Sequence, residues 1–112
     1  MRPPSINRLW LQGEVSSHPT TKAMNARLSI TSFELSMVEA WVNDAQESRE
    51  RHNRITVEVL GRDADRVAQE ARLGSWVSLE GYLRSEVFKG ENVVKVRTLS
   101  IQVWEVPIGR RH

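Results

Sequence analysis

The chain has 112 residues, of which 39% are hydrophobic and 27% are charged, and this length suits one domain with a small core. It contains no cysteine, which excludes disulfides, cysteine-based zinc sites and thiol catalysis. No run approaches the roughly 18 apolar residues of a membrane span, and the opening residues MRPPS carry no apolar signal segment. We therefore expect a cytoplasmic protein that does not contact a membrane.

The formal net charge is only +2, which is a weak sign of nucleic-acid binding by itself. Its distribution is more informative, because four cations gather around one predicted hairpin: Arg84, Lys89, Lys95 and Arg97. A small total charge predicts that only a few phosphates are neutralised and that binding is weak and salt-sensitive.

The N-terminal part predicts a loose arm over residues 1–6 and a first strand over about 7–16. In this strand apolar and polar residues alternate, which is the period of a half-buried strand. The predicted inward side chains are Leu9, Leu11 and Val15, and those on the outward face include Arg8, Trp10 and Gln12. Residues 16–24 are polar, contain Pro19 and predict a loop.

A second strand is predicted from about residue 26 into the region of Trp41. The alternation of apolar residues changes parity at Thr31 and Ser32, which indicates a β-bulge or a strong coil. Residues 42–53 (VNDAQESRERHN) are highly charged and have little strand propensity. Glu47 and Arg51 are spaced for a helix, but the flanking strands favour a mobile hairpin loop.

The next segment, residues 55–84, predicts a third strand, a short helix and a fourth strand. The third strand ends at Gly61, after which Asp63 is expected to cap the helix. The predicted helix buries one narrow apolar stripe: Ala64, Val67, Ala68 and Ala71. Gly74 is expected to end the helix in a left-handed conformation, and Gly81 interrupts the fourth strand where a barrel wall must bend.

The C-terminal part predicts a turn over residues 89–92, a fifth strand over about 93–105 and a short basic tail over 106–112. Five strands with one helix between the third and the fourth are the order of an OB-fold barrel, so we expect an all-β domain spanning residues 1–112. An SH3-like barrel is the alternative, which the position of the helix disfavours.

Two segments resemble the single-stranded DNA-binding protein family. Residues 74–81 read GSWVSLEG, similar to the pattern G-S-x-V-x-x-E/Q-G in the fourth strand of that family. Residues 7–13, NRLWLQG, look like the first strand of the family. The short predicted turn over 85–92 and the absence of a Gly/Pro-rich tail resemble primosomal replication protein N within this group.

The resemblance implies sequence-independent binding of single-stranded DNA by a homodimer, in a groove across the second and third strands. The implied interface residues of the dimer are Arg8, Trp10 and Gln12. In a single-strand groove, cations hold phosphates and aromatic rings stack on bases. The residues expected there are Lys22, Arg27, Trp41, Arg49, Arg51, Arg54, Tyr82, Arg84, Phe88, Lys89, Lys95 and Arg97.

Among the aromatic residues, Trp41 and Phe88 are the candidates for stacking on bases, and Phe33 is expected in the core. Trp76 is expected to cover one end of the barrel, and Trp104 to pack away from the groove. Core packing, end covering or subunit contact is the usual role of a single aromatic residue in a small barrel, so each assignment has this alternative.

The sequence predicts a protein that is not an enzyme and holds no cofactor or metal, since its histidines lack ligand spacing and no catalytic motif is present. The resemblance implies a role in replication restart, with a restart helicase and other primosome proteins as partners. A tail-less coating protein for single strands is one alternative. A protein-interaction OB module that docks through outward tryptophans is another.

Overall fold

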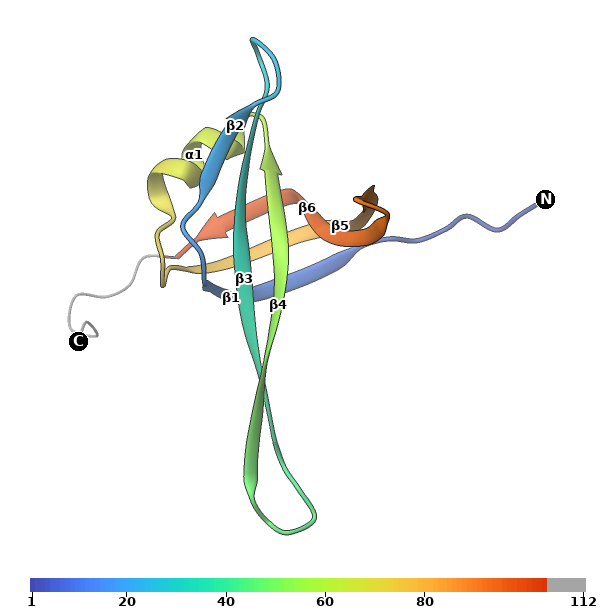
Figure 1. Ribbon diagram of the computed structural model, residues 1–112, viewed down its shortest axis with the longest axis vertical. Coiled ribbons are helices and arrows are strands. Elements are labelled where there is room, and N and C mark those ends of the chain that lie inside the picture. The colour runs from blue at the N-terminus through green and yellow to red at the C-terminus, as the bar shows by residue number, and fades with distance from the viewer. Residues whose placement is uncertain (105–112) are drawn as a thin grey trace.

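Alternating apolar residues build a closed β-barrel in the computed structural model, which describes residues 1–104 (Figure 1). Its elements are β1 Leu9–Val15, β2 Thr20–Ala23, β3 Ser29–Val42, β4 Ser48–Leu60, α1 Arg62–Glu70, β5 Trp76–Phe88 and β6 Glu91–Val103. The strand order is β1-β5-β6-β4-β3, and pairing of β1 with β3 closes the barrel. Among the described strands, only β4 and β6 pair in parallel. The predicted OB-fold, with its helix between the third and fourth barrel strands, is confirmed.

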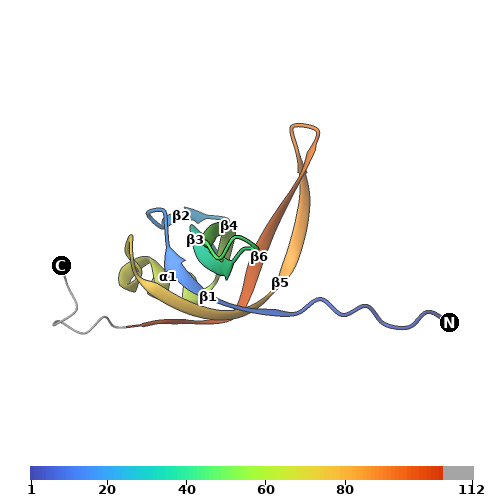
Figure 2. The same cartoon turned by 90° about the horizontal axis from the view of Figure 1, so that it is seen from below.

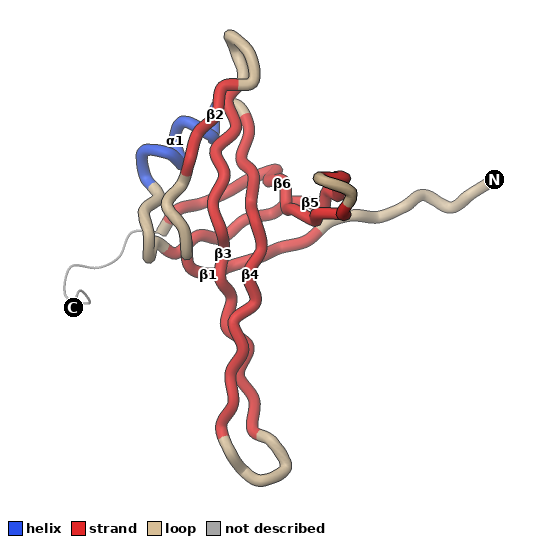
Figure 3. Tube along the Cα trace, viewed as in Figure 1, coloured by secondary structure: helices blue, strands red, loops and turns tan. Residues whose placement is uncertain are grey.

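The core is formed by the inward rows of all five barrel strands. Fully buried residues include Val15, Leu35, Val57, Val77 and Val96. Burying one such side chain stabilises the fold by about 1.5–3 kcal/mol. Phe33 also lies in the core, as predicted. Helix α1 covers one end of the barrel, beside β2 (Figures 1 and 3).

The prediction of a loop over residues 16–24 is wrong in part, because β2 pairs with β3 as an additional edge strand. The predicted bulge at Thr31 is also wrong, since the β3–β4 register runs without a shift from Ile30 to Val42. The change in parity has another cause. Thr31 faces the interior, where its hydroxyl donates to the carbonyl of Ala64 and also bonds the Thr21 hydroxyl. A polar residue satisfied in this way can occupy a core position.

The charged segment after Trp41 is not the predicted mobile loop, and it is not a helix. β3 and β4 pair as far as Val42 and Ser48, so the turn contains only residues 43–47. The side-chain oxygen of Asn43 accepts hydrogen bonds from the backbone N–H groups of Ala45 and Glu47, which fixes this turn. A two-stranded ribbon outside the barrel exposes both faces, and polar side chains therefore suit it. We call residues 38–52 the β3–β4 arm (Figure 1).

Helix α1 begins differently from the prediction. Gly61 occupies the N-cap position with a φ of 70° and no side chain caps the helix. Asp63 instead forms an ion pair with Arg66. Ala68 is exposed, whereas the other three residues of the predicted stripe are buried. Gly74 has a φ of 93° but lies in the turn after the helix, where its N–H donates to the Val15 carbonyl.

The last two strands form a second long hairpin. β5 continues to Phe88 and β6 begins at Glu91, so the turn is shorter than the predicted one and consists of Lys89 and Gly90. Both turn residues have positive φ, as tight hairpins require. We call residues 83–94 the β5–β6 arm, and Figure 2 shows it rising on the side of the barrel where β3 and β4 lie.

Two predictions about the C-terminal half have different outcomes. The predicted bend at Gly81 is confirmed, because the register between β5 and β6 shifts between Glu80 and Gly81. The predicted tail, 106–112, lies outside the described residues. Within residues 1–104 no helix is long and apolar enough to cross a membrane.

Candidate nucleic-acid interface

Four neighbouring strands, β3, β4, β6 and β5, present one continuous outer surface, which we call the central face. Strand register places its charged side chains in adjacent rows, because Glu58 lies opposite Arg97 on β6 and Arg97 lies opposite Tyr82 on β5. The central face consists of Glu34, Arg54, Glu58, Tyr82, Arg84, Glu86, Lys95 and Arg97. The structure thus brings together five of the predicted DNA contacts.

Each cation of the central face forms an ion pair with a carboxylate of the same face. Glu58 accepts from Arg97 at 3.0 Å and from Lys95 at 3.3 Å. Arg84 lies 3.4 Å from Glu86, and Arg54 lies 3.8 Å from Glu34. With four cations and three carboxylates, this surface is only weakly positive.

Glu58 is the most buried charged group of the central face, and its residue is 6% exposed. Burial alone would raise the pKa of its carboxyl group. The hydrogen bonds and positive charges of Arg97 and Lys95 outweigh burial, so the pKa of Glu58 lies below its usual value. The ionised form is therefore favoured by folding.

This shift predicts how acid destabilises the protein. A carboxylate with a lowered folded-state pKa contributes stability above its unfolded pKa of about 4.3, and that contribution is lost as the pH falls through the folded value. Replacing Glu58→Gln should lower the free energy of unfolding at pH 7 by roughly 1.5–3 kcal/mol. The difference from the wild type should shrink between pH 5 and pH 3, measured by urea denaturation. A difference independent of pH would contradict this role.

The β3–β4 arm carries an aromatic ring beside a cation. Trp41 is on the same side of β3 as the core residue Leu35. Its side chain is nevertheless 42% exposed, because the arm extends beyond the barrel. The guanidinium carbon of Arg51 lies 6.0 Å from the centre of the Trp41 ring. Arg51 forms no ion pair with a described residue, whereas Arg49 is paired with Glu47.

The β5–β6 arm repeats this arrangement at its tip. Phe88 is 62% exposed and follows Tyr82, Arg84 and Glu86 in the outward row of β5. The Lys89 ammonium lies 5.4 Å from the centre of the Phe88 ring and pairs with no carboxylate among residues 1–104. Each arm therefore offers an exposed ring together with an uncompensated positive charge.

Lys22 and Arg27 lie outside the four strands of the central face. Lys22 lies on β2, and Arg27 lies in the turn between β2 and β3. That turn and the tip of the β3–β4 arm lie at opposite ends of the long axis (Figure 1). The sequence placed Lys22 in a loop beside the expected groove and Arg27 on the second strand.

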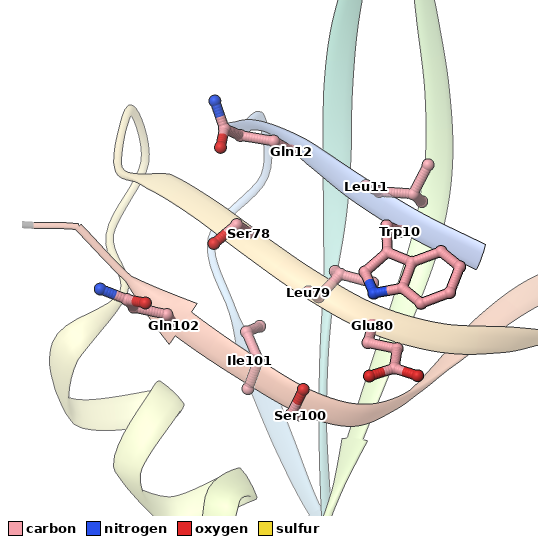
Figure 4. A pocket seen from close by; sticks show the side chains of 9 residues that line it. All are labelled: Trp10, Leu11, Gln12, Ser78, Leu79, Glu80, Ser100, Ile101 and Gln102. Atoms are coloured by element: carbon pink, nitrogen blue, oxygen red, sulfur yellow. The ribbon is translucent and has the colours of Figure 1, made fainter. Parts of the chain in front are cut away.

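The surface of β1, β5 and β6 carries the predicted dimer residues. Trp10 is 71% exposed, and it lines a shallow pocket with Gln12, Ser78 and Glu80 (Figure 4). Arg8 pairs with Glu80 of the same chain at 2.9 Å. One edge of β1 binds β5 throughout, whereas its other edge meets β3 only at residues 14 and 15. Residues 9–13 thus leave one backbone edge without a partner strand.

Two further tryptophans lie at the start of β5 and just after the end of β6. Trp76 is 47% exposed at the start of β5. Trp104 is 46% exposed, and its indole N–H donates to the Ser78 hydroxyl on β5. Sequence reasoning also missed Asn7, whose side-chain amide exchanges two hydrogen bonds with the backbone of Leu83 and extends the β1–β5 pairing.

Within residues 1–104 no group of three or more His, Asp or Glu side chains could hold a metal ion. The described part of the chain leaves no buried side-chain nitrogen or oxygen without a hydrogen-bond partner. The exposed side chains of the central face and the two arms are aromatic rings, arginines, lysines and a few carboxylates.

Comparison with known proteins identifies the family model that the chain matches and its structural neighbours. Residues 6–108 match the model described as the single-strand binding protein family. The Plasmodium falciparum SSB structure with ssDNA aligns at a TM-score of 0.84 and 18% identity, covering 94% of this chain and 100% of that one. A deletion mutant of the single-stranded DNA binding protein from Thermus aquaticus aligns at 0.79 and 23% identity, covering 89% of this chain. The wild-type Thermus aquaticus protein aligns at 0.76, with 23% identity over 89% of this chain.

The chain spans about half the length of the Thermus aquaticus proteins, with coverage of 51% and 50%. No curated protein sequence matches the chain. At these identities the structural neighbours establish the fold, and the family model establishes the family.

Proposed function

The chain belongs to the single-strand binding protein family, and from this membership we propose that it binds single-stranded DNA without sequence preference. The proposed binding surface is the central face with its two arms. The ssDNA complex of the Plasmodium falciparum neighbour supports this proposal.

The observation that carries the proposal is the pairing of an exposed ring with an uncompensated cation on each arm. Trp41 with Arg51 and Phe88 with Lys89 can each receive one base by stacking and one phosphate by charge. An aromatic ring can stack on any base, because all bases have a π face. Each stacked base contributes about 1–3 kcal/mol to the binding free energy. Trp41 and Arg51 continue the core-facing rows of β3 and β4, whereas Phe88 continues the outward row of β5, so a strand bound at both arms passes from one face of the β3–β4 ribbon to the central face. Stacking and charge hold such a flexible strand without reading its sequence.

A titration with oligo-dT tests this function. At low salt the oligonucleotide should quench the tryptophan fluorescence, because Trp41 stacks on a base. The affinity should fall with rising salt, with a slope of roughly −2 to −3, as expected when three or four phosphates are neutralised. Absence of both quenching and binding at low salt would contradict the proposal and favour a protein-interaction module docking through its exposed tryptophans.

We further propose that the protein acts as a homodimer through β1. Residues 9–13 have an unpartnered backbone edge, and the exposed Trp10 and Gln12 flank it. Exposed strand edges are templates for pairing with another chain. A sizing measurement on the titrated samples distinguishes a dimer from a monomer.

The narrower proposal is a role in replication restart, with a restart helicase and other primosome proteins as partners. The two-residue turn at Lys89 and Gly90 supports it by resemblance to primosomal replication protein N. A coating protein for single strands is the alternative within the family. Stimulation of a restart helicase on forked DNA favours the restart role, whereas coating without stimulation favours the alternative.

A further inference from the structure

Three arginines of the central face contact their carboxylates through the same nitrogen. In Arg54, Arg84 and Arg97 the atom nearest the partner carboxylate is Nε. The distances from Nε to the carboxylate oxygen are 3.8 Å, 3.4 Å and 3.0 Å, respectively. None of the three donates a hydrogen bond from either terminal Nη nitrogen to another described residue.

Arginines outside the central face use the other end of the guanidinium group. Arg8 and Arg49 donate to carboxylates from one Nη nitrogen, and Arg66 donates from both. The Nε contacts are therefore a property of the central face within the described chain. Neighbouring strands place Glu34 beside Arg54 and Glu58 beside Arg97, whereas Glu86 lies two residues from Arg84 on β5.

The chemical consequence concerns phosphate binding. The two Nη nitrogens of a guanidinium group present parallel N–H groups that match two oxygens of a phosphate. A carboxylate bound at Nε leaves these groups available and restricts the rotation of the long side chain. Ordering a free side chain on binding costs conformational entropy, and a side chain that is already held avoids most of this loss.

We propose that Glu34, Glu58 and Glu86 are positioning residues of the single-strand surface, each holding one arginine so that its terminal nitrogens receive a phosphate. This inference rests on the proposed function and deepens it, because it assigns a role to negative charges within a surface for a negative ligand. On a surface without this role, the same carboxylates would only repel the strand.

Net charge alone predicts that removing carboxylates from this surface raises its affinity for oligo-dT, whereas a positioning role predicts that the affinity falls. Glu34 and Glu86 have side chains that are 41% and 38% exposed, so the double variant Glu34→Ala/Glu86→Ala should fold. It raises the net charge by two, yet its affinity for oligo-dT should fall about threefold to fivefold, because two arginines lose their restraint. The variant Arg54→Lys/Arg84→Lys preserves the charge and should weaken binding by a similar factor, because lysine has no pair of parallel donors.

A matched control removes two carboxylates that hold no arginine. Asp44 lies in the turn of the β3–β4 arm and Glu91 directly follows the turn of the β5–β6 arm, and neither forms an ion pair with a described residue. Asp44→Ala/Glu91→Ala should bind oligo-dT about twofold more tightly, since it adds the same charge without releasing a guanidinium group. Equal tightening in both double variants would overturn the inference and leave the proposed function intact, whereas a wild-type protein that does not bind oligo-dT would overturn both.

Discussion

Removing both exposed rings, in the double variant Trp41→Ala/Phe88→Ala, should reduce the affinity for oligo-dT by roughly 30-fold or more. Each ring is expected to contribute about 1–3 kcal/mol by stacking on a base, and each 1.4 kcal/mol corresponds to a factor of ten. The rings are 42% and 62% exposed on arms outside the barrel, so their loss should leave the melting temperature nearly unchanged. Fluorescence anisotropy of a labelled oligonucleotide measures the affinity without relying on tryptophan.

Trp76→Ala is the matched control for this experiment. Trp76 is exposed to a similar extent, 47%, but lies at the start of β5, away from both arms. Its replacement should change the affinity by less than about twofold, because no stacked base is lost. Equal losses in the control and the double variant would show that the arms are not the place where bases stack.

Adding one methyl group at Gly81 should destabilise the barrel by about 3 kcal/mol or more, because the new atom has no space. A Cβ at Gly81 would meet the backbone carbonyl of Arg97 and the side chain of Val96. The register shift between Glu80 and Gly81 brings the two strands this close, so relief would require movement of the backbone itself. Urea denaturation of Gly81→Ala measures the loss, and a midpoint equal to that of the wild type would contradict this account.

Gly90→Asn provides the comparison. Gly90 has a φ of 81° in the β5–β6 turn, and a Cβ there would meet nothing within 4 Å. Asparagine tolerates positive φ better than other side chains, so the loss should stay below about 1 kcal/mol. The contrast separates close packing in the barrel wall from conformational preference in a turn.

The candidate site was predictable only in part. The sequence identified the hairpin cations and the two exposed rings, Trp41 and Phe88, because aromatic residues in polar segments stand out in an alternating pattern. It did not identify Glu34 and Glu58 as partners of arginines, since those two pairs join different strands, and it did not recognise the Arg84–Glu86 pair within β5. It did not show that Lys22 belongs to an additional edge strand, β2, and Arg27 to the turn between β2 and β3.

The errors in the predicted fold have a common origin: they concern polar residues that are either exposed on a strand or hydrogen-bonded inside the core. Residues 48–54 are a strand although their composition favours a loop, because pairing with β3 stabilises an extended backbone whatever its side chains. Thr31 occupies a core position because the Ala64 carbonyl, 33 residues away, accepts its hydrogen bond. Local propensity carries no information about such distant partners.

The sequence by itself determined the barrel, the place of the helix and the bend at Gly81, because period-two alternation and glycine positions act locally on the backbone. Only the tertiary structure decided which charges neighbour one another. The parallel register of β4 and β6 places Glu58 between Lys95 and Arg97, nearly forty residues further along the chain. Electrostatic interactions fall off with distance in space, and closure of the barrel alone sets that distance.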